Sequence, residues 1–214
     1  MERVTITTGD NVKIAGNYAG ESGRRGVLLV HMMPATKESW YDFSEKLVER
    51  GFQALAIDLR GHGESEGGPD GYKKFSDKDH RASIKDIGAG VEFLKSKKAS
   101  SISLAGASIG ANLALEYAAG HLEISKVMLL SPGLDYRGVK TEPVISRLRD
   151  GQSIYFVASL DDPYSADTVK TLSEMAPVYV EKVVKVFENA GHGTTIFEKE
   201  PAFMDEVAEW LTAN

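Results

Sequence analysis

The chain has 214 residues, of which 42% are hydrophobic and 26% are charged, and its net charge is −6 at pH 7. This length favours one domain with a sizeable core, and the composition is ordinary for a soluble globular protein. The lysines and arginines are scattered along the chain, so we expect no nucleic-acid partner. Without cysteines there can be no disulfide, no thiolate nucleophile and no cysteine metal site.

The pattern of apolar residues indicates neither a membrane span nor a signal peptide. No apolar run approaches the roughly 18 residues that a membrane span needs. The first residues, Met1 to Thr5, do not form the apolar core of a signal peptide. We therefore expect a cytoplasmic protein that does not bind membranes.

The hydrophobic pattern predicts strands and helices in alternation after an opening hairpin. Residues 2–7 and 11–19 alternate polar and apolar around a Gly-Asp-Asn turn, which is typical of an antiparallel hairpin. Five further strands are predicted at residues 26–31, 52–58, 126–131, 153–159 and 182–187, and a sixth in the short apolar run with Ile102 and Leu104. Helices are predicted at residues 37–50, 77–98, 143–149, 165–175 and 201–212, and directly after Gly110.

This alternation is typical of an α/β fold with a doubly wound sheet. We expect eight strands, mostly parallel, with an N-terminal antiparallel hairpin and helices on both faces. The connection between residues 131 and 153 has room for one short helix but hardly for another domain. Residues 1–214 are therefore predicted to form a single domain without a separate cap.

One segment combines a strand, a sharp turn and a helix. Gly106-Ala107-Ser108-Ile109-Gly110 lies where a short apolar strand gives way to an alanine- and leucine-rich helix, and it has the G-x-S-x-G pattern of a nucleophile elbow. So tight a turn leaves no room for a Cβ atom at the two glycines. Ser108 is expected at the strand's carboxyl end with its hydroxyl exposed, beside a helix N-terminus that favours negative charge.

Polar residues follow several of the other predicted strands as well. In an open α/β sheet, catalytic groups gather at the carboxyl ends of the strands. A serine nucleophile needs an adjacent base, and the base needs a carboxylate that orients it. Candidates follow the strands at His31, Asp58, Ser108, Ser131, Asp161, Asp162 and His192. The chain thus contains all three residue types in the order serine, aspartate, histidine.

Four segments together resemble the α/β-hydrolase family. They are Val30 to Pro34 with Trp40 beyond it, Asp58-Leu59-Arg60-Gly61-His62-Gly63-Glu64-Ser65, the elbow at 106–110, and Leu160 to Pro163 with Gly191-His192-Gly193. The resemblance implies an α/β-hydrolase fold in which Ser108 is the nucleophile, His192 the general base and acid, and Asp162 the orienting carboxylate. Asp162 is preferred to Asp161 because the family's catalytic aspartate directly precedes a proline, and Asp135 is a more distant third candidate.

The same resemblance implies an oxyanion hole made of two backbone N–H groups, those of Ile109 and Met33. The chain departs from the family at Met32, which stands where a glycine is usual. Met32 is therefore a lesser candidate donor.

The other histidines are expected to have structural roles. His31 is predicted to form hydrogen bonds within the oxyanion loop, and His62 to shape its tight turn. His80 and His121 are expected at helix ends, facing solvent. None of them has metal-ligand spacing, and no glycine pattern resembles a nucleotide-binding loop, so we expect neither a metal nor a cofactor.

These residues indicate a serine hydrolase that works through an acyl-enzyme intermediate. With little or no cap, the site should be open, which favours a carboxylesterase acting on small-molecule, short-chain acyl esters. A peptidase or amidase, a thioesterase or lactone hydrolase, and a non-catalytic binding module of the same fold remain alternatives. Whether the chain is a monomer or a homodimer is left open.

Overall fold

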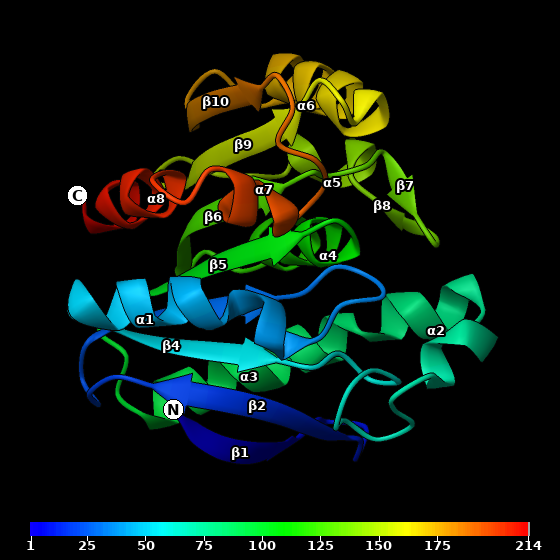
Figure 1. Ribbon diagram of the computed structural model, residues 1–214, viewed down its shortest axis with the longest axis vertical. Coiled ribbons are helices and arrows are strands. Elements are labelled where there is room, and N and C mark those ends of the chain that lie inside the picture. The colour runs from blue at the N-terminus through cyan, green and yellow to red at the C-terminus, as the bar shows by residue number, and fades with distance from the viewer. Residues whose placement is uncertain (214) are drawn as a thin grey trace.

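The computed structural model describes residues 1–213 and is built around one eight-stranded sheet (Figure 1). The order across the sheet is β1-β2-β4-β3-β5-β6-β9-β10. The strands are β1 (Glu2–Thr7), β2 (Lys13–Ala19), β3 (Arg25–Val30), β4 (Phe52–Ile57), β5 (Ile102–Ala107), β6 (Ile124–Leu130), β9 (Ser153–Ser159) and β10 (Glu181–Phe187). β2 pairs antiparallel with β1 and β4, and all other neighbours are parallel. The predicted fold class, including the opening hairpin, is confirmed.

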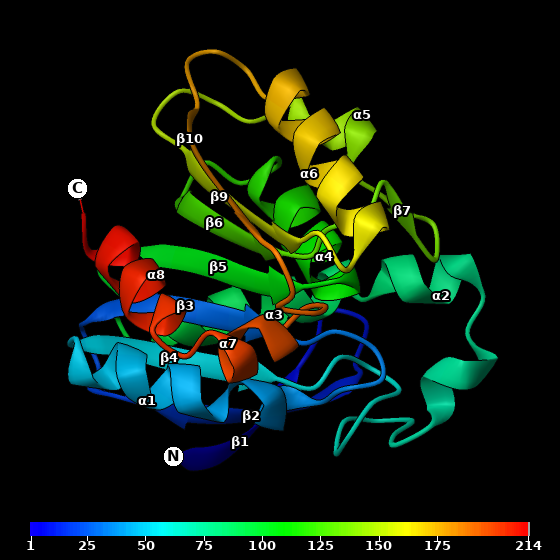
Figure 2. The same cartoon turned by 45° about the horizontal axis from the view of Figure 1, so that its top comes forward.

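Helices cover both faces of this sheet. They are α1 (Tyr41–Glu49), α2 (Asp77–Ala82), α3 (Ile84–Ser96), α4 (Ile109–Ala118), α5 (Glu142–Ile145), α6 (Pro163–Met175), α7 (Thr195–Lys199) and α8 (Phe203–Thr212), with short 3-10 helices at Lys37–Trp40 and Gly71–Lys74. α1, α7 and α8 pack on one face, and α3 to α6 on the other (Figures 1 and 2). Within residues 1–213, no helix combines the length and apolar character that crossing a membrane requires.

The strands are buried on both faces because successive side chains point to opposite sides of the sheet. In β3, Val27 and Leu29 join the core beneath α1 and α8, while Leu28 and Val30 join the core beneath α3 and α4. All four side chains are inaccessible to solvent. This double burial explains why the strand is a continuous apolar run in the sequence.

The single helix predicted over residues 77–98 is wrong, because the structure breaks it at Ser83. Ser76 begins α2 with a capping box, in which its side chain and that of Asp79 satisfy each other's backbone N–H groups. α2 then turns so that His80 is buried, with its ring edge-on to Phe75 at 5.4 Å. The expectation that His80 faces solvent is therefore wrong as well.

The connection between β6 and β9 contains a small hairpin that the sequence pattern does not predict. Its strands are β7 (Asp135–Tyr136) and β8 (Val139–Lys140), and the helix that follows is only four residues long. Asn112 of α4, which is fully buried, fastens the start and end of this segment. Its amide donates to the carbonyl oxygens of Gly133 and Val139 and accepts from the Gly133 N–H. The hairpin therefore has a fixed place above α4.

Candidate active site

The six parallel strands all end at the same edge of the sheet, and the residues that follow them form the candidate site (Figure 2). Ser108 stands between β5 and α4 with φ 54° and ψ −121°, a backbone conformation that is strained for a residue with a side chain. A Cβ atom on Gly106 would overlap the Gly110 carbonyl, and one on Gly110 would overlap the Val30 carbonyl. The two glycines thus permit the sharp turn that places Ser108 at the sheet edge.

Ser108 is less exposed than the sequence suggested. Only 7% of its surface is accessible, and the residue lines a pocket of about 730 Å³. The pocket is bounded by Met33 and Pro34 after β3, by parts of residues 72–80, and by residues 135–137 of the hairpin. The serine is therefore reached from this pocket and not from an open surface.

His192 and Asp162 lie together although thirty residues separate them. The Nδ1 atom of His192 is 2.6 Å from an oxygen of the Asp162 carboxylate. A carboxylate can only accept, so Nδ1 carries the proton and Nε2 is left with a free lone pair. The side chains are 36% and 19% exposed, so the imidazole remains accessible while the carboxylate is largely covered.

The neighbouring Asp161 points elsewhere. Its carboxylate accepts hydrogen bonds from the Ser159 hydroxyl at 2.5 Å and from the Gly191 N–H at 3.0 Å, and it lies 3.7 Å from the Lys199 ammonium. Asp161 therefore holds the loop that carries His192. Asp135 faces its own turn, where it accepts from the Gly138 N–H at 2.7 Å. Of the three candidate carboxylates, Asp162 is the one that meets the imidazole.

Two further serines anchor the histidine loop to the sheet. The Ser159 hydroxyl accepts from the Ala190 N–H at 2.8 Å, and the Ser131 hydroxyl accepts from the Gly193 N–H at 2.9 Å. Ser131 directly follows β6, the neighbour of β5. A Cβ on Gly193 would lie 3.5 Å from that of Ala107 and would overlap the Met32 sulfur. The residue after His192 thus packs beside the residue before Ser108.

Tyr136 of β7 lies near both the serine and the histidine. Its hydroxyl is 3.2 Å from that of Ser165, and its ring meets the His192 ring edge-on, with 6.3 Å between centroids. Burial raises the pKa of Tyr136, and nearby Ser165 and Ser108 partly offset this rise. Within residues 1–213, no direct hydrogen bond joins Ser108 to His192.

The two expected oxyanion donors have unoccupied backbone N–H groups. Neither Met33 nor Ile109 donates a backbone hydrogen bond to any residue in the described part of the chain. Ile109 is the first residue of α4, where the free N–H groups and the helix dipole favour an anion. Gly110 packs against the carbonyl oxygens of Val30 and His31, which brings the loop before Met33 close to the elbow.

His31 holds the loop before Met33 in place through its two ring nitrogens. It is fully buried, its Nε2 accepts from the Leu59 N–H at 3.0 Å, and its Nδ1 therefore donates to the Met32 carbonyl at 2.8 Å. Burial lowers the pKa of His31 to about 4, and neighbouring His62 lowers it further in the same direction. At neutral pH His31 is an uncharged bridge between the loops after β3 and β4.

The loop after β4 is held by two buried ion-pair networks. The Lys37 ammonium, with 1% of its side chain exposed, lies 2.8 Å from Asp58 and 2.9 Å from Glu64. Arg60 contacts Asp86 at 2.7 Å and Asp10 at 2.9 Å. These contacts give the charged residues of the loop a structural role.

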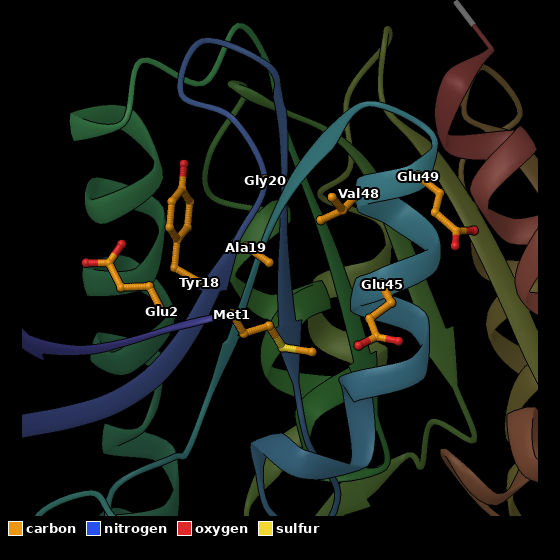
Figure 3. Close-up of a pocket in the computed structure, with 8 residues that line it drawn as sticks. All are labelled: Met1, Glu2, Tyr18, Ala19, Gly20, Glu45, Val48 and Glu49. Carbon is orange, nitrogen blue, oxygen red and sulfur yellow. The ribbon is translucent and has the colours of Figure 1, made fainter.

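A second pocket lies away from these residues (Figure 3). It has a volume of about 560 Å³ and is formed by Tyr18 to Gly20 at the end of β2, by Met1 and Glu2, and by Glu45, Val48 and Glu49 of α1. β2 runs antiparallel to β4, so its end lies at the opposite edge of the sheet from Ser108. In residues 1–213, no three His, Asp or Glu side chains are placed to hold a metal ion.

Residues 26–183 match a model of the α/β-hydrolase fold family. The chain belongs to the α/β-hydrolase fold family. Among curated proteins, AB hydrolase superfamily protein YisY of Bacillus subtilis is 26% identical over 171 residues. The match covers 75% of this chain but only 55% of that protein, so the chain spans about half the length of its curated relative.

Solved structures of esterases and of a dienelactone hydrolase share this arrangement of strands and helices. The esterase Pf2001 of Pyrococcus furiosus superposes with a TM-score of 0.77 at 20% identity, over 98% of this chain and 88% of that one. An esterase from Exiguobacterium antarcticum gives 0.79 at 15% identity, over 99% and 100%. A dienelactone hydrolase from Anabaena variabilis gives 0.78 at 20% identity, over 98% and 94%. At these identities, the comparisons show a shared fold.

The sequence reasoning did not predict the roles of three residues of the site. Ser131 was one of the candidates that follow a strand, and Ser159 was only the last residue of one. Both hydroxyls accept from N–H groups of a loop more than thirty residues away. Tyr136 gave no signal, because it lies in a two-residue strand. The position of Ser131 directly after a buried strand was the one clue available.

Proposed function

We propose that this chain is a serine esterase in which Ser108 is the nucleophile, His192 the general base and acid, and Asp162 the orienting carboxylate. The observation that carries the proposal is the 2.6 Å contact between His192 and Asp162, at the sheet edge where the strained elbow presents Ser108. The family and the esterases among its structural neighbours support the same reaction class.

Catalysis would begin when a substrate enters the pocket and the Ser108 side chain rotates toward His192. Nε2 removes the hydroxyl proton as the oxygen attacks the ester carbonyl, and the Asp162 carboxylate stabilises the resulting imidazolium. The backbone N–H groups of Met33 and Ile109 would bind the oxyanion, each typically contributing about 3 kcal/mol of transition-state stabilisation. His192 then protonates the leaving alcohol and activates the water that releases the acid.

The substrates we propose are small, short-chain acyl esters. The pocket beside Ser108 has a volume of about 730 Å³, which is in the range of small-molecule sites. Only the β7–β8 hairpin and α5 lie between β6 and β9. We therefore also propose that residues 1–214 act as one hydrolase domain without a separate cap.

A fluorophosphonate probe tests the nucleophile directly. It should label the wild type and Ser100→Ala, a matched change at an exposed serine, but not Ser108→Ala. Hydrolysis of 4-nitrophenyl butyrate should be lost in Ser108→Ala alone. A wild type that is not labelled would contradict the proposal and favour a binding module. Faster cleavage of an aminoacyl anilide would favour an amidase.

A further inference from the structure

The pocket beside Ser108 has two polar walls that meet at its mouth. One wall is the β7–β8 hairpin, and the other is the segment that includes Lys73 and His80. The walls are packed together where Gly138 meets Asp77, since a Cβ on Gly138 would lie 2.8 Å from that of Asp77. The mouth is therefore formed by two segments that are distant in the chain and pack together, and not by one flexible loop.

The charged groups of the lining are Lys73, Asp135 and Arg137, and two of them are already paired. The Lys73 ammonium lies 2.8 Å from Asp70. The Asp135 carboxylate accepts from the Gly138 N–H at 2.7 Å and lies 3.9 Å from the Lys140 ammonium. Arg137, by contrast, has no ion-pair partner within residues 1–213. Arg137 is therefore the charged residue of the lining that remains available to a ligand.

The surroundings of the pocket are more positive than the rest of the chain. Segments 70–81 and 135–140 contain six lysines and arginines against four aspartates, whereas the whole chain has a net charge of −6. His80, buried in the pocket wall, adds a polar group that is neutral at pH 7, because burial and then Arg137 lower its pKa. The potential at the mouth therefore favours an anion over a cation.

The position of His192 indicates which half of an ester occupies this pocket. In the proposed reaction, the leaving alcohol must face His192, because that residue gives it a proton. Ser108 and Met33 line the pocket, whereas His192 is not part of its lining. The carbonyl carbon would sit beside Ser108, with the alcohol toward His192 and the acyl chain directed into the pocket.

We propose that the pocket binds the acyl chain and that Arg137 binds a carboxylate at the far end of that chain. This inference rests on the proposed esterase function and narrows its substrates to half-esters of aliphatic dicarboxylic acids, which keep one free carboxylate. A planar guanidinium suits this role because it can donate two parallel hydrogen bonds to a carboxylate. The chemistry at Ser108 is unchanged, and selectivity comes from the added charge contact.

The test compares two esters that differ in one charge. 4-Nitrophenyl hydrogen adipate has a terminal carboxylate, and 4-nitrophenyl methyl adipate has a methyl ester in its place. After correction for spontaneous hydrolysis, we expect the wild type to prefer the charged ester by about fivefold in kcat/KM, as for a partly exposed ion pair. The preference should shrink in about 0.5 M NaCl, because salt screens exposed charges.

Arg137→Gln should abolish this preference. Lys140→Gln removes the same charge from the same hairpin outside the lining, so it should keep most of the preference. Equal rates for the two esters in the wild type, or an unchanged preference in Arg137→Gln, would overturn the inference.

Should neither ester be hydrolysed, the esterase proposal fails, and calorimetric binding of monomethyl adipate then tests the subsite alone. Arg137→Gln must weaken that binding if the inference is right, and equal affinity of the variant and the wild type would overturn it.

Discussion

The backbone of Ser108 is held between β5 and α4. Tyr136 and Arg137, by contrast, belong to a hairpin whose strands are only two residues long. We call these regions the reacting edge and the pocket wall. The reacting edge comprises the residues directly after β3, β5, β6, β9 and β10, and the pocket wall comprises residues 71–82 and 135–140. Hydrogen bonds from the sheet and from Ser131, Ser159 and His31 fix the first region. In the pocket wall, the hairpin is held by hydrogen bonds from Asn112 and by contacts between β8 and α2.

This difference separates the demands of reaction and of recognition. Proton transfer needs atoms within hydrogen-bond reach in one orientation, and strand ends with buried anchors provide that precision. Recognition of an acyl chain tolerates more movement, and it can be changed by substitutions in irregular connections without disturbing the sheet. We therefore expect substitutions at the reacting edge to have large effects and those in the pocket wall to have small ones.

The largest effect should come from Asp162, and the adjacent Asp161 is its matched control. Asp162→Asn should lower kcat by about ten-thousand-fold, because an amide no longer holds the imidazole in the tautomer that leaves Nε2 free. Asp161→Asn can still accept from Ser159 and Gly191, so it should lower kcat by less than about tenfold. Steady-state kinetics on one ester measures both. If kcat fell more in Asp161→Asn than in Asp162→Asn, the orienting carboxylate would be Asp161 and not Asp162.

The packing of the elbow is the next test. Gly106→Ala should reduce the free energy of unfolding by at least about 3 kcal/mol, because its methyl group would overlap the Gly110 carbonyl. Gly120→Ala is the matched control, since a Cβ there would meet nothing closer than 3.6 Å. Urea denaturation compares the two variants. If they proved equally stable, the elbow would be more adaptable than its contacts indicate.

His31 gives the reacting edge a dependence on pH. The pKa of His31 is about 4 in the folded chain and about 6.5 when unfolded, so the unfolded state takes up the proton first. Its stabilising effect is fully present above pH 6.5 and is lost as the pH falls toward 4. His31→Gln should cost about 1 to 3 kcal/mol at pH 7, and the difference from wild type should narrow as the pH falls. Denaturation curves across this range measure it, and a constant difference would contradict the buried neutral imidazole.

The smallest effect is expected in the pocket wall. Tyr136→Phe removes the hydroxyl beside Ser165 and Ser108 but keeps the ring, so kcat should fall only about fivefold, the worth of one hydrogen bond. Because burial raises the pKa of Tyr136, the hydroxyl keeps its proton at neutral pH, and the ratio of rates should not change between pH 6 and 8. A loss of several hundredfold in kcat would mean that Tyr136 takes part in the reaction, as the residues of the reacting edge do.

Much of the reacting edge could be read from local patterns. The strand that precedes Ser108 is a continuous apolar run, and the turn after it needs glycines on both sides, so the serine could be placed from the pentapeptide and its flanks. The preference for Asp162 over Asp161 came from the family resemblance, because the family's catalytic aspartate directly precedes a proline. The structure brings Asp162 to His192, and the catalytic roles of these residues remain a proposal.

The pocket wall could not be read in this way. Nothing in the spacing of residues 77–98 marks the break at Ser83 or the burial of His80 against Phe75. The β7–β8 hairpin is too short for a period-two pattern, and Asn112, which holds it, lies more than twenty residues earlier in the chain. Contacts of this kind depend on how α4 packs on the sheet.

The sequence by itself therefore determined the order of the eight sheet strands and the residues that stand at the strand ends. Alternating burial and steric limits at glycine act over a few neighbouring residues, and such effects leave a visible pattern. Only the tertiary structure decided that His192 meets Asp162, that Gly193 is held by Ser131, and that Arg137 faces the pocket beside Ser108. These arrangements join segments that are distant in the chain, and their geometry exists only once the sheet has formed and the helices have packed on it.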